Sequence, residues 1–158
     1  MQGMRINDEM TVAGQVTPED LRQAASDGFK SVLNLRAPDE EGALPDERRH
    51  AEAAGLDYVN IPVKKDEIND DLATRVLAGI DDLPKPALIH CGTGMRAGAM
   101  AMMNVATRSG MSADAAMDKA RSMGFDCDSE PQLKAFFEKY VDSHNAGSGG
   151  GGSGGTAA

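Results

Sequence analysis

The stretch "ALIHCGTGMR", residues 87–96, carries the residues that indicate both the fold and the chemistry of this chain. Its apolar beginning is typical of a buried strand, and the residues that follow Arg96 continue in a helical pattern. Gly92 and Gly94 permit the backbone conformations of a tight turn between the two. The stretch therefore predicts a strand, a turn and a helix, with Cys91 at the end of the strand.

The turn after Cys91 has the features of an anion-binding site. Backbone N–H groups of such a turn point inward, and the N-terminus of the following helix adds partial positive charge. Arg96 adds a planar guanidinium that can hold two oxygens of a tetrahedral anion. The same groups stabilise a thiolate, so we expect Cys91 to attack phosphorus in a phosphate ester or a sulfane sulfur. The predicted anion-binding residues are Gly92, Thr93, Gly94, Met95 and Arg96.

Strand patterns alternate with helix patterns through the first two thirds of the chain, and helix patterns fill the rest. This alternation predicts the α/β class, with a central, mostly parallel sheet of roughly four or five strands flanked by about six helices. Ligands of such sheets bind beyond the carboxyl ends of the strands, where the loops after Arg36, Val63 and His90 open. The predicted strands cover 10–16, 29–36, 56–63 and 86–90, and the predicted helices cover 17–28, 46–55, 69–84, 96–110, 112–124 and 129–143.

The composition divides the chain into a folding unit and a tail. Residues 146–158 consist only of Gly, Ser, Ala and Thr, which cannot build an apolar core. We therefore expect a single domain over residues 4–144, followed by a flexible linker or a leftover of cloning over residues 145–158. A domain of this length can bury enough apolar surface to fold without disulfides or metals.

The charge and the cysteines narrow the classes of partner. A net charge of −9 argues against nucleic acid and anionic membranes, which need a basic face, but it allows a small anionic substrate. Cys91 and Cys127 are the two cysteines, too few for a disulfide framework, and no apolar run is long enough for a signal peptide or a membrane span. These features predict a cytoplasmic protein. No Cys/His cluster has metal-binding spacing, so no metal or cofactor is expected.

The segment from His90 to Arg96 resembles the signature of the cysteine-dependent protein tyrosine and dual-specificity phosphatases. The upstream order of "SVLNLR", an acidic loop and "GLDYVNIPV" is also similar, above all to the small bacterial phosphatase-like domain that occurs fused in beta-lactamase-hydrolase-like proteins. The resemblance covers about residues 4–142. It implies hydrolysis of a phosphate monoester, small or on a protein, through a thiophosphate on Cys91. Arg96 would hold the phosphate. His90 would lie behind the cysteine, and a structural, hydrogen-bonding role that orients the loop is favoured for it over proton transfer.

Two departures from the phosphatase signature keep other functions open. Four residues separate Cys91 from Arg96, where phosphatases have five, and this shorter loop resembles that of single-domain rhodaneses, which hold a persulfide. Ala97 stands where phosphatases usually carry a hydroxyl that assists the thiolate as leaving group. The alternatives are therefore a sulfurtransferase with a persulfide on Cys91, or a non-catalytic module that binds an anion through Arg96.

Three further side chains have less specific signals. A phosphatase needs an acid after the "IPV" strand to protonate the leaving oxygen, and Asp66 is the candidate, although a solvated loop acid is an equal interpretation. Arg36 could pair with Asp39 or Glu40 at the pocket rim, but a surface role is favoured. Acidic neighbours disfavour the thiolate of Cys127, which argues against a resolving thiol. Two further acids, Glu67 and Asp70, lie behind Asp66.

Overall fold

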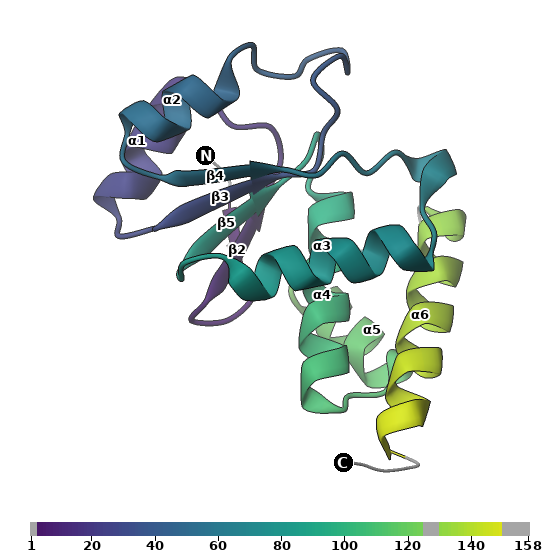
Figure 1. The fold of residues 1–158 in the computed structure, drawn as a ribbon. Helices are drawn as coiled ribbons and strands as arrows, with labels where there is room; N and C mark the ends of the chain where they lie inside the picture. The colour runs from purple at the N-terminus through teal and green to yellow at the C-terminus, as the bar shows by residue number, and fades with distance from the viewer. Residues whose placement is uncertain (1–2, 125–129, 150–158) are drawn as a thin grey trace. The chain divides into compact units, whose positions relative to one another are not determined.

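A five-stranded sheet in the order β1-β2-β5-β3-β4 organises the computed structural model, which describes residues 3–124 and 130–149 (Figure 1). The strands are β1 (Gly3–Arg5), β2 (Met10–Ala13), β3 (Ser31–Asn34), β4 (Asp57–Asn60) and β5 (Ala87–His90). Four of them pair in parallel, and β1 adds to the edge in the antiparallel direction. The predicted mostly parallel α/β sheet is confirmed; the very short β1 was not among the predicted strands.

Helices connect and follow the strands as the sequence predicts. They are α1 (Pro18–Ser26), α2 (Glu47–Ala53), α3 (Asp70–Asp82), α4 (Met95–Ser109), α5 (Ala113–Ser122) and α6 (Pro131–Gly149), with a short 3₁₀ turn, η1 (Lys65–Glu67). Side-chain caps begin three of these helices, because Thr17, Asn69 and Ser112 each accept a hydrogen bond from a backbone N–H in the first turn. The helices predicted over residues 17–28, 69–84 and 112–124 therefore begin at these same three residues.

The register of the sheet brings three strand ends together. His90, the last residue of β5, pairs with Ala13 of β2 and with Asn34 of β3. Because these strands are parallel, the segments that follow them begin at the same edge of the sheet. The loop that starts at Cys91 therefore lies between the segments that start at Gly14 and Leu35.

An apolar core lies between the sheet and the helices α1 and α2, which cover one of its faces, whereas α3 lies on the other (Figure 1). Successive strand residues point to opposite faces, so Val32 and Leu88 belong to this core while their neighbours Leu33 and Ile89 face the other side. The buried members of the core are Ala13, Val16, Leu21, Ala24, Val32, Ala51, Leu56 and Leu88.

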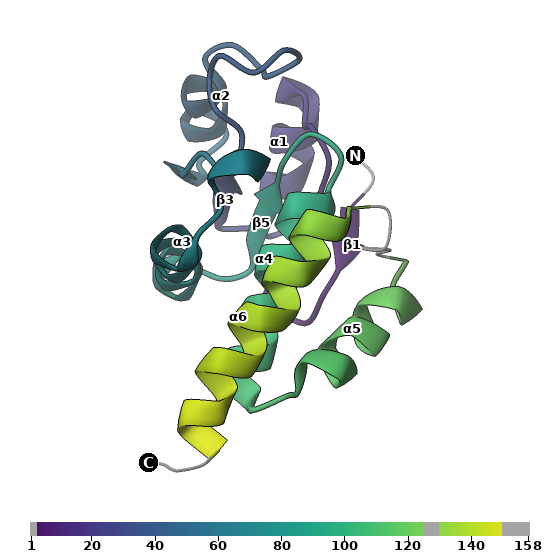
Figure 2. The same cartoon turned by 90° about the vertical axis from the view of Figure 1, so that its right-hand side faces the viewer.

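The chain forms two compact units, residues 1–101 and 102–158, and the boundary falls inside α4. In the second unit α5 and α6 pack side by side (Figure 2), and Leu133, Phe137 and Tyr140 of α6 are buried. The domain bounds 4–144 stay a prediction. Helix α6 continues to Gly149, and the rest of the predicted linker lies outside the described residues, as does Cys127.

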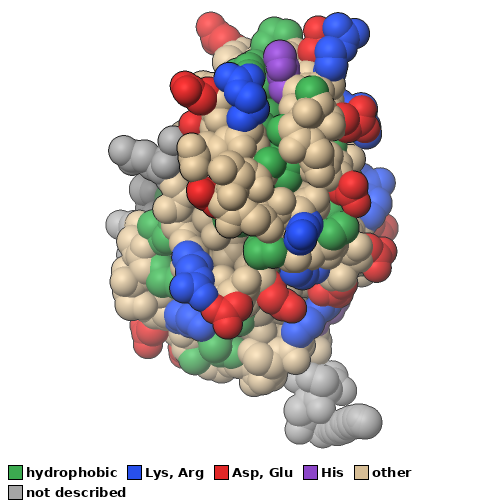
Figure 3. All heavy atoms as spheres, turned by 90° about the vertical axis from the view of Figure 1, so that its left-hand side faces the viewer, with side chains coloured by type: hydrophobic (Ala, Val, Ile, Leu, Met, Phe, Trp, Pro, Cys, Tyr) green, Lys and Arg blue, Asp and Glu red, His purple; other side chains and the backbone are tan. Residues whose placement is uncertain are grey.

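The surface carries charges of both signs. Acidic and basic side chains alternate on the face shown in Figure 3, which mixes the two types without separating them into large fields. Within residues 3–124 and 130–149, no helix is both long and apolar enough to cross a membrane.

We expect Leu21→Ala to lower the free energy of unfolding by about 2–5 kcal/mol, because Leu21 is fully buried in the core and its removal leaves a cavity. Urea denaturation measures the change. The neighbouring exposed position supplies the control, and Arg22→Ala should change the free energy by less than about 0.5 kcal/mol. Equal losses in the two variants would contradict this assignment of the core.

Candidate active site

The loop between β5 and α4 folds backbone N–H groups around the sulfur of Cys91. The Gly94 N–H donates to Cys91 Sγ at 3.1 Å, and the Ala97 N–H donates to it at 3.4 Å. Gly94 has a φ of +92°, a value that L side chains rarely adopt, and this turn directs its N–H inward. Cys91 is fully buried. The sulfur therefore lies at the start of a helix with two polarised donors on it, the arrangement that stabilises a thiolate.

The end of β2 holds this loop in place. The Cys91 N–H donates to the carbonyl of Ala13, and the Gln15 N–H donates to the carbonyl of Gly92 at 3.1 Å. A Cβ atom at Gly14 would lie 3.0 Å from that Gly92 oxygen, so a side chain there would push the two segments apart by a few tenths of an ångström. The glycine lets the two backbone segments approach closely enough for these bonds to form.

Arg96, the second residue of α4, turns its guanidinium toward a carboxylate. Its Nη1 and Nη2 atoms donate to the two oxygens of Glu40, each at 3.1 Å, and Nη1 also donates to the Val63 carbonyl at 2.6 Å. Burial lowers the pKa of Arg96, but the bonds to Glu40 and the charge of Cys91 outweigh burial and raise it above its ordinary value. The structure thus places a permanent cation next to the sulfur.

Glu40 is shared between two arginines. Arg36 Nε donates to Glu40 at 3.1 Å, and the Ala37 N–H donates to the same carboxylate at 2.8 Å. The hydrogen bonds from Arg96 are the largest influence on this carboxyl, and together with those from Ala37 and Arg36 they outweigh burial and lower its pKa to about 2. The sequence pointed to Glu40 only as one possible partner of Arg36. No sequence signal paired it with Arg96, which is 56 positions away.

The expected surface role of Arg36 is wrong. The residue is only 8% exposed, and its guanidinium also donates to Gln15 Oε1 at 2.9 Å and to the Glu41 carbonyl. The pairing with Glu40, which the sequence left as the less favoured reading, is the one that forms. A residue at the end of a buried strand extends along the sheet edge, so its burial is decided by the loops that fold over that edge.

His90 directly precedes the cysteine in the chain and pairs with a buried carboxylate. Its Nε2 is 2.5 Å from Glu47 Oε2, and both residues are almost fully buried. Glu47 Oε1 also accepts from Gln15 Nε2 at 3.3 Å. Glu47 begins α2 directly after Asp46, whose left-handed φ of +56° turns the chain there. The sequence predicted a hydrogen-bonding role for His90, but it did not identify its partner.

Two other residues predicted for the site, Thr93 and Asp66, have exposed side chains. The Met95 N–H donates to Thr93 Oγ1 at 3.4 Å, so the exposed Thr93 side chain uses one of the donors expected for an anion. Asp66 lies in η1 with an exposed side chain, and it makes no hydrogen bond or ion pair with the described residues. Its loop nevertheless begins at the site, because Val63 contacts Arg96.

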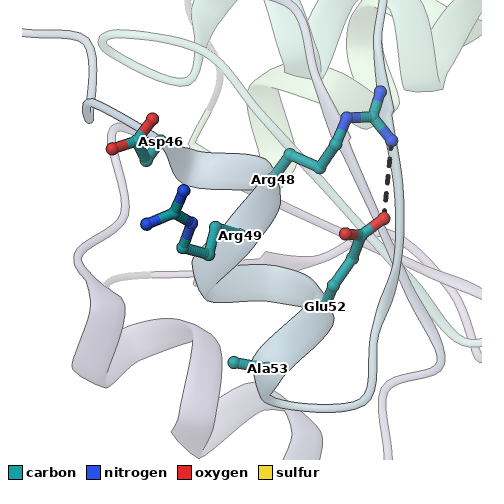
Figure 4. Close-up of a pocket in the computed structure, with 5 residues that line it drawn as sticks. All are labelled: Asp46, Arg48, Arg49, Glu52 and Ala53. Carbon is teal, nitrogen blue, oxygen red and sulfur yellow. Dashed lines mark ion pairs between the residues drawn. The ribbon is translucent and has the colours of Figure 1, made fainter.

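A second hollow lies on the outer side of α2 and is lined by Asp46, Arg48, Arg49, Glu52 and Ala53 (Figure 4). Arg48 and Glu52 pair there at 3.7 Å, but more than half of each side chain is exposed, so the pair is weak. Among the described residues, no group of three or more His, Cys, Asp or Glu is arranged to hold a metal ion. The loop after β5 is therefore the strongest candidate site.

Comparison with known proteins now identifies the family. Residues 4–108 match the family model described as "Beta-lactamase hydrolase-like protein, phosphatase-like domain". The chain belongs to this family. The resemblance drawn from the loop motif and the upstream strands is thus confirmed, and the matched residues of the phosphatase-like domain contain every residue of the cluster around Cys91.

Relatives and solved structures agree with this membership. A beta-lactamase hydrolase-like protein of Agrobacterium fabrum is 30% identical over 152 residues, which cover 87% of this chain but only 35% of that protein. A structure of a putative phosphatase from Shewanella putrefaciens has a TM-score of 0.76 at 22% identity and covers 90% of both chains. TpbA of P. aeruginosa in complex with pTyr has a TM-score of 0.75 at 19% identity, over 90% of this chain and 87% of TpbA. At these identities the two structures show a shared fold.

We expect Gly94→Ala to slow the alkylation of Cys91 by iodoacetamide at neutral pH, because a side chain at a φ of +92° shifts the N–H that bonds the sulfur. Gly110→Ala is the matched control, since Gly110 has a φ of +73° with open space around it and is remote in sequence from the loop. Both variants should lose about 1 kcal/mol of stability. Equal alkylation rates would refute the role given to the Gly94 N–H.

Proposed function

We propose that this chain is a cysteine-dependent phosphatase that hydrolyses phosphate monoesters through a thiophosphate on Cys91. One observation carries the proposal: the Cys91 sulfur accepts two backbone N–H bonds at a helix start and interacts with the Arg96 guanidinium. Such a sulfur is a nucleophile, and the groups around it are the ones that stabilise negative charge developing on a phosphoryl group. Membership of the phosphatase-like family supports the same chemistry.

The reaction takes place in two displacements. The Cys91 thiolate attacks phosphorus and the bond to the ester oxygen breaks, while Asp66 gives its proton to that oxygen. A water molecule then attacks phosphorus, the phosphorus–sulfur bond breaks, and Asp66 takes the proton of the water. Phosphate leaves and the thiolate is restored.

The proposal gives Ala97 a role despite its missing hydroxyl. In the second displacement the thiolate is the leaving group, and it needs hydrogen-bond donors as its charge returns. The backbone N–H groups of Ala97 and Gly94 both donate to the sulfur, so they supply this stabilisation in place of a side-chain hydroxyl. Backbone donors are fixed by the fold, so they need no reorganisation during the reaction.

The substrate we propose is a small phosphate monoester or a phosphoprotein of the tyrosine or dual-specificity type. The complex of TpbA with pTyr supports a phosphorylated side chain as ligand of this fold. A catalytic thiolate requires a reducing compartment, which fits the cytoplasmic location predicted from the two cysteines. The chain spans about a third of the A. fabrum relative, so the substrate of a longer fused protein is a separate question.

Cys91→Ser should abolish the hydrolysis of an aryl phosphate, with a loss of roughly 10³-fold or more, because a hydroxyl is a far weaker nucleophile at neutral pH. The thermal midpoint of the variant shows whether its fold is intact. Equal rates in the parent and the variant, or no hydrolysis by either, would overturn the proposal. Incubation of the parent with thiosulfate tests the alternative, since a mass gain of one sulfur on Cys91 without phosphatase activity would favour a sulfurtransferase.

Asp66→Asn should lower kcat by about 10²–10⁴-fold for alkyl phosphates, whose leaving group needs a proton, and much less for activated aryl phosphates. Glu67→Gln, one position further along η1, is the control with the same change in charge. If both substrates lost activity equally, Asp66 would not be the proton donor.

A further inference from the structure

Arg96 bonds Glu40 and the Val63 carbonyl through Nη1 and Nη2, and its guanidinium also interacts with Cys91. We propose that Glu40 is a positioning residue that anchors the outer end of Arg96, so that the substrate oxyanion binds side-on to Nε and Nη2. The inference rests on the proposed phosphatase function and adds a residue that does not itself touch the substrate. Glu40 belongs to the acidic loop, residues 37–46, which connects β3 to α2.

Three N–H groups of the Arg96 guanidinium bond Glu40 and Val63, and two do not. A guanidinium has five N–H groups. The two on Nη1 bond Glu40 Oε2 and the Val63 carbonyl, and one on Nη2 bonds Glu40 Oε1. The two that are left lie parallel on the Nε/Nη2 edge, the geometry that matches two oxygens of a phosphate. The guanidinium also interacts with Cys91, so a phosphoryl group that binds the sulfur would meet this edge.

Glu40 is rigid enough to act as an anchor because it is fixed from its other side. Arg36 and the Ala37 N–H donate to its carboxylate. Arg36 in turn has each of its nitrogens bonded, to Glu40, Gln15 and the Glu41 carbonyl. Arg36 is therefore a support for Glu40, with three of its five N–H groups bonded to the protein around it.

The position of Gly92 shows why a carboxylate is needed between the two arginines. The point where a Gly92 Cβ would lie is 3.5 Å from Arg36 Cζ and 3.6 Å from Arg96 Nη2, so both guanidinium groups border the residue after the nucleophile. Two like charges this close repel each other in a partly buried site, where water screens them less than at the surface. Glu40 bonds both and stays ionised in the working range of pH, since its pKa is about 2.

A different role for Glu40 would be competition, in which its carboxylate occupies Arg96 until a substrate displaces it. The two roles predict opposite changes in oxyanion affinity when Glu40 is replaced. Glu40→Gln removes a negative charge from an anion site, so simple Coulomb attraction and relief of competition both predict tighter oxyanion binding. Positioning predicts weaker binding, because an amide offers only one acceptor oxygen and no charge to a guanidinium that needs both.

Inhibition by orthovanadate, a tetrahedral oxyanion, tests the inference. For Glu40→Gln we expect the inhibition constant to rise by about tenfold, the effect of losing one charge-assisted hydrogen bond, and kcat to fall with it. Alkylation of Cys91 by neutral iodoacetamide should persist, because it needs the thiolate but not the orientation of Arg96. An inhibition constant that is unchanged or lower would overturn the inference.

Two further variants test whether a raised inhibition constant comes from the position of the Glu40 carboxylate or from the loss of one negative charge. Glu40→Asp keeps the charge but shortens the side chain, so it should also raise the inhibition constant, and a value equal to that of the parent would refute positioning. Glu41→Gln is the matched control, because it makes the same charge change on the neighbouring exposed residue, which contacts Arg36 only through its carbonyl. If the parent itself neither hydrolysed phosphate esters nor bound orthovanadate, the proposed function would fail rather than the role of Glu40.

Discussion

The partly buried ion pair between Arg96 and Glu40 is the interaction on which the rest of the site depends. Taking a guanidinium out of water is costly unless a counter-charge and acceptors replace the lost water. Glu40 supplies the charge from the loop after β3, and the Val63 carbonyl supplies an acceptor from the loop after β4. Arg96 belongs to the helix after β5. One cation thus joins three loops at the carboxyl edge of the sheet, and the sulfur lies beside it.

A second buried pair completes the support of the catalytic loop. His90, which precedes the nucleophile in the chain, bonds Glu47. Gln15 connects this pair to the arginine network, because it bonds both Glu47 and Arg36. The acidic loop is therefore held near both ends, by Glu40 at one and by Glu47 directly after the other. Breaking one member of such a network leaves its partner buried without compensation, which makes the arrangement cooperative.

Local sequence patterns predicted the helices, strands and turns well, but they predicted the hydrogen-bond partners of the buried charged residues poorly. The helix caps, the apolar strand before Cys91 and the glycine turn are short-range features, so the residues that determine them are neighbours in the chain. The burial of Arg36 was predicted wrongly, and Glu47 was not predicted at all. Both are charged residues whose place depends on contacts with segments that are remote in the sequence, and a charge is predicted to be exposed unless its partner is known.

The sequence by itself determined that a cysteine and an arginine would share one turn, because a strand, two glycines and a helix start leave little other choice for residues 87–96. Only the tertiary structure decided which way the arginine turns. Its guanidinium interacts with the sulfur, and the carboxylate of Glu40 and the Val63 carbonyl fix its position. These acceptors come from 56 residues before and 33 residues before Arg96, so only the folded sheet brings them to it.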